Sequence, residues 1–154
     1  MLLGLLSTNQ PISDFYTRFN ALKCLNSLLF LNIQRLQQFF VGSPTAMAKL
    51  MDLLTSEESM EVERNESLLL LIGLCRSKVE IQKLVVFEGI FDVLFNIVDK
   101  EQQSGVIVQD CMELLIHLLA LRSTLITGFD HADMVVLKLF VFFLDPTTGY
   151  VYVT

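Results

Sequence analysis

The sequence predicts an all-α protein whose helices stack into a repeating array. Three observations predict this class. Apolar residues recur at intervals of three and four along most of the 154 residues, polar helix-start residues separate these segments, and one seven-residue pattern occurs twice. Hydrophobic residues make up 53% of the chain and charged residues only 18%, against a usual value of about 25%. Many side chains must therefore pack against one another.

Eight segments carry the helical spacing of apolar residues, and four helix-start signals lie near their beginnings. Such a signal places a side-chain oxygen where it accepts a hydrogen bond from the first backbone N–H groups of a helix, or a proline in the first turn. The signals are Ser13–Asp14, Ser43–Pro44, Thr55-x-x-Glu58 and Ser77-x-x-Glu80. The predicted helices span residues 14–31, 32–41, 44–54, 59–76, 78–87, 90–100, 105–121 and 131–144.

The segment SLLLLIGLC, Ser67–Cys75, is the most apolar part of the middle of the chain. It has nine residues between charged flanks, whereas a membrane-spanning helix needs roughly 20. The later stretch MVVLKLFVFFL has eleven residues and contains Lys138, so it is also too short. A helix that is apolar on all sides is a core helix. We therefore expect Ser67–Cys75 to be covered by neighbouring helices, with Gly73 allowing one of them to approach closely.

A repeated pattern connects the two halves of the chain. The heptapeptide IQRLQQF at residues 33–39 matches IQKLVVF at residues 81–87, 48 positions later. A weaker third copy places Phe129 in register with Phe87, 42 positions on. Armadillo and HEAT repeats have periods of roughly 40–47 residues. The sequence thus predicts an armadillo/HEAT-like right-handed α-solenoid fragment of about three repeats.

Both ends of the chain are apolar, whereas solenoids usually end in repeats with a polar outer face. This pattern predicts a fragment of a longer repeat array, or an isoform without caps. Either one would self-associate through its end faces.

Catalytic, cofactor and nucleic-acid functions find little support in the sequence. No known nucleotide-binding, metalloprotease or hydrolase motif is present, and Cys24, Cys75 and Cys111 lie far apart within apolar patterns. The acidic pair around His131 fits the start of a helix better than a metal site. A net charge of -6 with few clustered basic residues argues against nucleic acid. We predict no catalytic residue, no cofactor and no metal.

A protein-binding surface is the remaining expectation. Its candidate residues are polar positions of the second repeat and one acidic residue in the following helix. They are Gln82, Lys83, Glu88, Asp92 and Asp110.

Specific motifs resemble a known family. The stretches VERNESLLLLIGLCRSKVEIQKLVVFEGIFDVLFNIVDKE and GVIVQDCMELLIHLL are similar to the armadillo-type head of the general vesicular transport factor family. The points of similarity are Arg64-Asn65 before the leucine run, Arg76-Ser77, Ile81-Gln82-Lys83, Val86-Phe87-Glu88 and the step from Ile107 to Cys111. The resemblance covers residues 2–128, so we divide the chain into a partial head, 1–128, and a divergent helix and tail, 129–154.

The resemblance implies a non-enzymatic module that acts in vesicle tethering between the endoplasmic reticulum and the Golgi. It implies a cytoplasmic protein held at these membranes by its partners. Those partners would be a Rab-type small GTPase, other tethering factors and a full-length family member. The family's coiled coil and acidic tail have no counterpart in this sequence.

Two alternatives remain at this stage. One is a truncated isoform that regulates full-length dimers. The other is an unrelated armadillo scaffold such as a nuclear import adaptor, which reads peptides with a ladder of tryptophan and asparagine. The sequence has no tryptophan, which disfavours the import adaptor.

Overall fold

The structure is a computed structural model that describes residues 2–6, 14–100 and 105–119. Within these ranges the chain forms one short 3-10 helix and seven α-helices, and it contains no strand. The elements are η1 (Leu2–Leu6), α1 (Phe15–Leu31), α2 (Ile33–Val41), α3 (Pro44–Thr55), α4 (Glu61–Cys75), α5 (Val79–Phe87), α6 (Ile90–Lys100) and α7 (Val106–Leu119). The predicted all-α class is therefore confirmed. The predicted helix 131–144 and the boundary at 128/129 lie outside the described residues.

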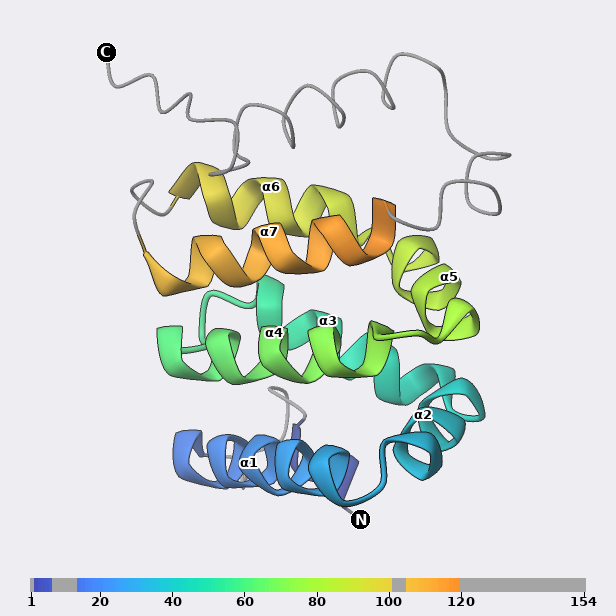
Figure 1. The fold of residues 1–154 in the computed structure, drawn as a ribbon. Helices are drawn as coiled ribbons and strands as arrows, with labels where there is room; N and C mark the ends of the chain where they lie inside the picture. The colour runs from blue at the N-terminus through green and yellow to red at the C-terminus, as the bar shows by residue number, and fades with distance from the viewer. Residues whose placement is uncertain (1, 7–13, 101–104, 120–154) are drawn as a thin grey trace.

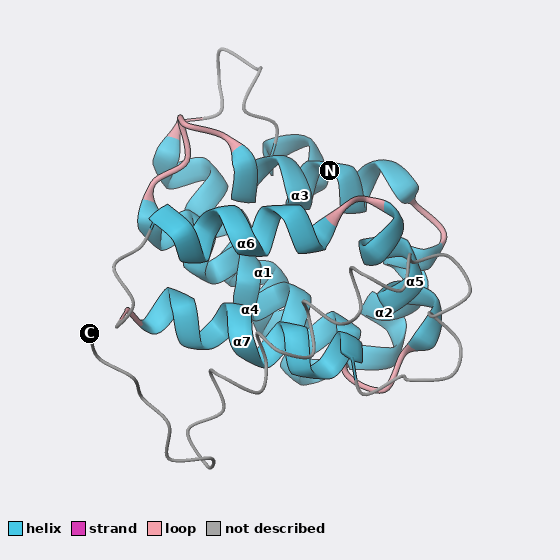
Figure 2. Cartoon of the chain, turned by 90° about the horizontal axis from the view of Figure 1, so that it is seen from above, coloured by secondary structure: helices cyan, strands magenta, loops and turns pink. Residues whose placement is uncertain are grey.

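The helices repeat in space as they do in the sequence. α1, α4 and α7 lie side by side and run in the same direction, while α2 stacks on α5 and α3 on α6 (Figure 1). Seen from above, α3 and α6 lie on one side of the row α1–α4–α7, and α2 and α5 close one end of it (Figure 2). The two copies of the seven-residue pattern are thus the stacked helices α2 and α5. This layering is that of the predicted α-solenoid.

Helix α4 lies at the centre of the stack. It contacts both its neighbours in the row, α1 and α7, as well as α2, α3 and α5. The side chains of Leu68, Leu70, Leu71 and Leu74 are fully buried, which confirms that Ser67–Cys75 is a covered core segment. Leu69 is the exception, because 41% of its surface remains exposed on the open face of the row.

Gly73 lies in α4 where α1 comes closest. A Cβ atom added at Gly73 would overlap Cδ2 of Leu29 in α1 and lie 3.2 Å from its Cγ. Real Cβ atoms do not approach other atoms so closely, so a side chain here would require Leu29 to move. The expectation that Gly73 permits a close helix approach is confirmed.

The helix starts agree only partly with the capping signals. Asp14 caps α1 by accepting a hydrogen bond of 2.8 Å from the backbone N–H of Thr17, and Ser43 precedes α3 with Pro44 in its first turn. The predicted capping box at Thr55 is wrong. Helix α3 continues through Thr55, whose hydroxyl donates to the Asp52 carbonyl at 3.2 Å.

The second capping box, at Ser77, is wrong as well. Ser77 has a φ of 58°, in the left-handed region, and links α4 to α5. The N-cap of α5 is Lys78, which makes no side-chain capping bond. The turn between the two helices is short, so the backbone of Ser77 must reverse direction there and cannot take the extended conformation of an N-cap.

Two buried glutamines donate hydrogen bonds to the backbone carbonyl groups at the C-terminal end of α4. The last carbonyl groups of a helix have no partner within it, and buried ones need another donor. The amide of Gln37 in α2 donates to the carbonyls of Leu74 at 2.9 Å and Arg76 at 3.1 Å. The amide of Gln82 in α5 donates to the carbonyl of Cys75. These bonds fix both short helices against the C-terminal end of α4.

Candidate functional site

The structure separates the five predicted contact residues. Lys83 and Asp92 are exposed on α5 and in the first turn of α6, and Glu88 is the half-buried C-cap of α5. Gln82 is only 3% exposed and bonds to α4, so the structure places it in the interior and not on the polar side of the repeat. Its position next to Lys83 in the sequence gave no sign of this, because adjacent helical residues point in different directions.

Asp110 lies apart from the other four, in the first turns of α7. It is half-buried, and its Oδ2 atom has no hydrogen-bond partner among the described residues. Burial, together with the negative charge of Glu113, raises the pKa of its carboxyl group above the ordinary value. Ionisation of this carboxyl group therefore lowers the stability of the folded state, and the group is not an obvious contact point for a partner.

The open face of the row α1–α4–α7 carries a groove of about 680 Å³. Apolar side chains from α1 and α4 line it together with charged side chains. The apolar residues include Leu29, Phe30, Leu69 and Ile72. The sequence did not predict this groove, because the four leucines Leu68–Leu71 are identical in the sequence and only the structure shows that Leu69 is the exposed one.

Ion pairs between neighbouring helices border this groove. Lys23 of α1 lies 3.3 Å from Glu66 of α4, and Asn26 donates a hydrogen bond of 2.8 Å to the same carboxylate. On the other side, Arg76 lies 3.6 Å from Glu113 of α7. The side chains of Lys23, Arg76 and Glu113 are half or more exposed, so these pairs contribute little to stability. These residues bring both positive and negative charges to the groove, and a polypeptide segment can pair with them.

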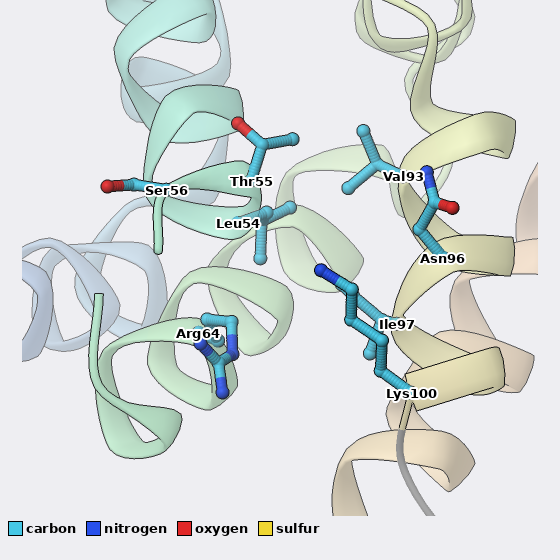
Figure 3. A pocket seen from close by; sticks show the side chains of 8 residues that line it. All are labelled: Leu54, Thr55, Ser56, Arg64, Val93, Asn96, Ile97 and Lys100. Carbon is cyan, nitrogen blue, oxygen red and sulfur yellow. The ribbon is translucent and has the colours of Figure 1, made fainter. Parts of the chain in front are cut away.

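A second, smaller hollow of about 310 Å³ lies between α3, α4 and α6. Figure 3 shows Arg64 on one side and Lys100 reaching into the hollow from α6. Arg64 Nη1 also donates to the carbonyl of Ser59 at 2.8 Å. Thr55 and Asn96 add a hydroxyl and an amide to the lining. Two cations with neutral polar groups suit an acidic side chain of a partner better than an apolar ligand.

The thiols of the described residues show no sign of redox or metal chemistry. Cys24 is exposed, whereas Cys75 and Cys111 are buried, and all three are free. Burial raises the pKa of Cys75 to about 12, so its thiol stays protonated and unreactive at neutral pH. In the described parts of the chain, no three His, Cys, Asp or Glu side chains gather to hold a metal ion.

The arrangement of the helices is that of a known class of protein. Parallel rows of stacked helices, with an open groove on one row, are the architecture of an armadillo-like α-solenoid. A crystal structure of Uso1-1 superposes with a TM-score of 0.69 and 27% sequence identity, over 77% of this chain and 18% of that one. No family model matches the sequence.

This chain is homologous to a general vesicular transport factor and to a golgin candidate. It is 44% identical over 108 residues to the general vesicular transport factor p115 of Homo sapiens, and 46% identical over 102 residues to Golgin candidate 6 of Arabidopsis thaliana. The matched segments cover 69% and 65% of this chain but only 11% of each relative. The predicted family resemblance is therefore confirmed for a small part of these longer proteins. None of the described helices is long and apolar enough to cross a membrane.

Proposed function

We propose that this chain is a non-enzymatic protein-interaction module that acts in vesicle tethering between the endoplasmic reticulum and the Golgi. The observation that carries the proposal is the 44% identity to the p115 factor over 108 residues, together with the shared fold. The role is consistent with a cytoplasmic protein at the membranes of these two compartments.

The partners we propose are a Rab-type small GTPase and other tethering factors. The exposed pair Lys83 and Asp92, with Glu88 between them in the sequence, offers charges of both signs near the turn from α5 to α6. Charged residues at the rim of an interface set the association rate and the choice of partner. The apolar groove on α1 and α4 offers a second contact area of a size suited to a peptide segment.

A pull-down with charge reversals tests the predicted contacts. The variant carrying Lys83→Glu and Asp92→Lys should capture less of a purified Rab-type GTPase in its GTP-bound form than the wild-type chain does. The matched control reverses Arg35 and Asp52, which are exposed on α2 and α3. Circular dichroism should show unchanged helicity in both variants. Equal capture by wild type and by the Lys83/Asp92 variant would remove this contact site.

Proximity labelling in cells tests the wider role. The full chain, fused to a labelling enzyme, should tag proteins of the interface between the endoplasmic reticulum and the Golgi. A labelled set dominated by nuclear-pore proteins would contradict the proposed role and favour an import scaffold.

A further inference from the structure

Two exposed phenylalanines occupy the same position in the repeated pattern. Phe39 ends the first copy and Phe87 the second, and 47% and 86% of their surfaces are exposed. Large apolar side chains are normally drawn into the interior, because exposure of a phenylalanine costs roughly 1.5–3 kcal/mol relative to burial. A repeated exposed aromatic residue therefore suggests a surface that is covered in the working state of the protein.

A basic residue lies four positions before each of these phenylalanines. Arg35 precedes Phe39 and Lys83 precedes Phe87, and both cations are exposed. Residues four apart lie on the same helix face, so each short helix presents one cation beside one aromatic ring. Neither cation forms a salt bridge with any residue that the structure describes.

The helices that carry the two pairs, α2 and α5, stack on each other at one end of the row of helices (Figure 1). The end of α1, which leads directly into α2, adds two more exposed apolar side chains. Phe30 is 93% exposed and Leu31 is 81% exposed. We call this set the α2–α5 edge, and it consists of Phe30, Leu31, Arg35, Phe39, Lys83 and Phe87.

The two segments that carry this edge have a formal charge opposite in sign to that of the whole protein, although Arg76 in the second segment pairs with Glu113 of α7. Helix α2, and the segment from Arg76 to Glu88 that contains α5, hold four basic and two acidic residues. Their formal charge is thus +2, whereas the chain carries -6. A basic, aromatic edge on an acidic protein can orient it, because an anionic surface attracts this edge and repels the acidic part of the chain.

We propose that the α2–α5 edge binds directly to the surface of a bilayer that contains anionic phospholipids. Its aromatic rings would enter the boundary between headgroups and acyl chains, while Arg35 and Lys83 would contact the phosphates. Peripheral contact of this kind requires no membrane-spanning helix.

The shape of the edge favours a bilayer over a protein partner. The groove on α1 and α4 and the hollow between α3, α4 and α6 are not lined by Phe39, Phe87, Arg35 or Lys83, and all four of these side chains are exposed. If such exposed rings are to leave water on binding, the partner must offer a space that they can enter. A fluid bilayer opens such space for any spacing of the rings, whereas a protein would need matched pockets for two helices.

Vesicle flotation with the purified full chain tests the proposal without any protein partner, so its outcome is separate from that of the GTPase pull-down. We expect the chain to float with vesicles of phosphatidylcholine and phosphatidylserine, and much less with phosphatidylcholine alone. Added salt should release it, since surface attraction is screened. Each of Arg35→Gln and Lys83→Gln should weaken the apparent affinity roughly fivefold.

The aromatic part of the edge is tested by a pair of serine substitutions. Phe39→Ser with Phe87→Ser should weaken vesicle binding by about tenfold or more, because the apolar area that enters the bilayer is lost. Tyr16→Ser is the matched aromatic control, since Tyr16 is 70% exposed near the start of α1, at the opposite end of the row. Lys49→Gln in α3 is the matched charge control. Neither control should change vesicle binding.

A fluorescence probe reports insertion directly. The chain has no tryptophan, so Phe87→Trp introduces a single indole reporter. Its emission should shift to shorter wavelength when anionic vesicles are added, and the emission of Tyr16→Trp should not. Flotation that is insensitive to phosphatidylserine, equal losses in the control variants, or an unshifted emission of the Phe87→Trp variant would overturn the proposal. Intact flotation of an edge variant that has lost binding to an acidic protein would assign the edge to that protein instead.

Discussion

The Nε atom of Arg18 in α1 donates to the Oε1 atom of Glu63 in α4 at 2.7 Å, and the Glu63 side chain is fully buried. The other carboxylate oxygen accepts the backbone N–H of Met60 at 2.8 Å. One side chain therefore both joins the first two helices of the row and satisfies the start of α4. This second role explains how α4 begins without a polar N-cap residue.

Removal of the Glu63 carboxylate should destabilise the fold strongly. Glu63→Ala leaves Arg18 without this partner and frees the Met60 N–H, and we expect a loss of about 3–5 kcal/mol in the free energy of unfolding. Chemical denaturation followed by circular dichroism measures it. Glu61→Ala, at an exposed position in the same turn, should cost under about 1 kcal/mol. Replacing both members, as Arg18→Met with Glu63→Leu, should recover part of the loss. Similar losses at Glu61 and Glu63 would contradict this role.

Because Gly73 and Leu29 are in close contact, we expect substitutions at these two positions to have coupled effects on stability. Gly73→Ala gains about 1 kcal/mol of helix propensity but drives its methyl group into Leu29, at a typical cost of roughly 1–3 kcal/mol. We expect a net loss in the wild-type background. In a Leu29→Ala background the clash is absent, so the same substitution should stabilise the protein. Denaturation curves for the four proteins give the coupling energy, and a value near zero would show that Leu29 moves aside without cost.

Neighbouring leucines of α4 should respond very differently to a charge. Leu70 is fully buried, so Leu70→Asp places an unpaired carboxylate in the core and should cost at least about 3 kcal/mol. Leu69 is 41% exposed, so Leu69→Asp should leave the melting temperature nearly unchanged. Thermal melts of the two variants test the core position of α4. A Leu70→Asp protein with wild-type melting would refute it.

Asp110 should make stability depend on acid pH. The pKa of its carboxyl group is raised in the folded state, so the protonated form favours folding and the ionised form favours unfolding. The protonated group contributes fully to stability below the ordinary pKa of 3.8, and this contribution is lost as the pH rises above it. Asp110→Asn removes this cost. The variant should unfold at higher denaturant concentration than wild type at neutral pH, and the difference should shrink toward pH 3.8. A gain that is constant with pH would point to packing and not to charge.

Helix positions were largely predictable because the spacing of apolar residues is a local property. Seven of the predicted helices lie within two residues of the observed ends, and the stacking of α2 on α5 followed from the repeated pattern. The helix starts at Thr55 and Ser77 were not predictable from the motif alone. Helix α3 continues through Thr55, and α5 begins only after Ser77. The motif does not show how each helix packs against its neighbours.

Surface residues were harder to predict than helices. Lys83 and Asp92 are exposed as expected, but Gln82 turned out to be a buried partner of the Cys75 carbonyl. The groove on α1 and α4 was missed because its walls come from segments about 40 residues apart. A single sequence shows that a residue is polar, but not which carbonyl lies within its reach.

The spacing of apolar residues and the repeated pattern are enough to predict a stack of repeated helices, and the uniformly apolar segment Ser67–Cys75 is enough to predict its own burial, because these are local properties of the chain. Only the tertiary structure decided that Glu63 pairs with Arg18, that Gln37 and Gln82 bond to the end of α4, and that Phe39 and Phe87 remain exposed. Those outcomes depend on the rotation of each helix against its neighbours. That rotation is set by the fit of side chains that are distant in sequence.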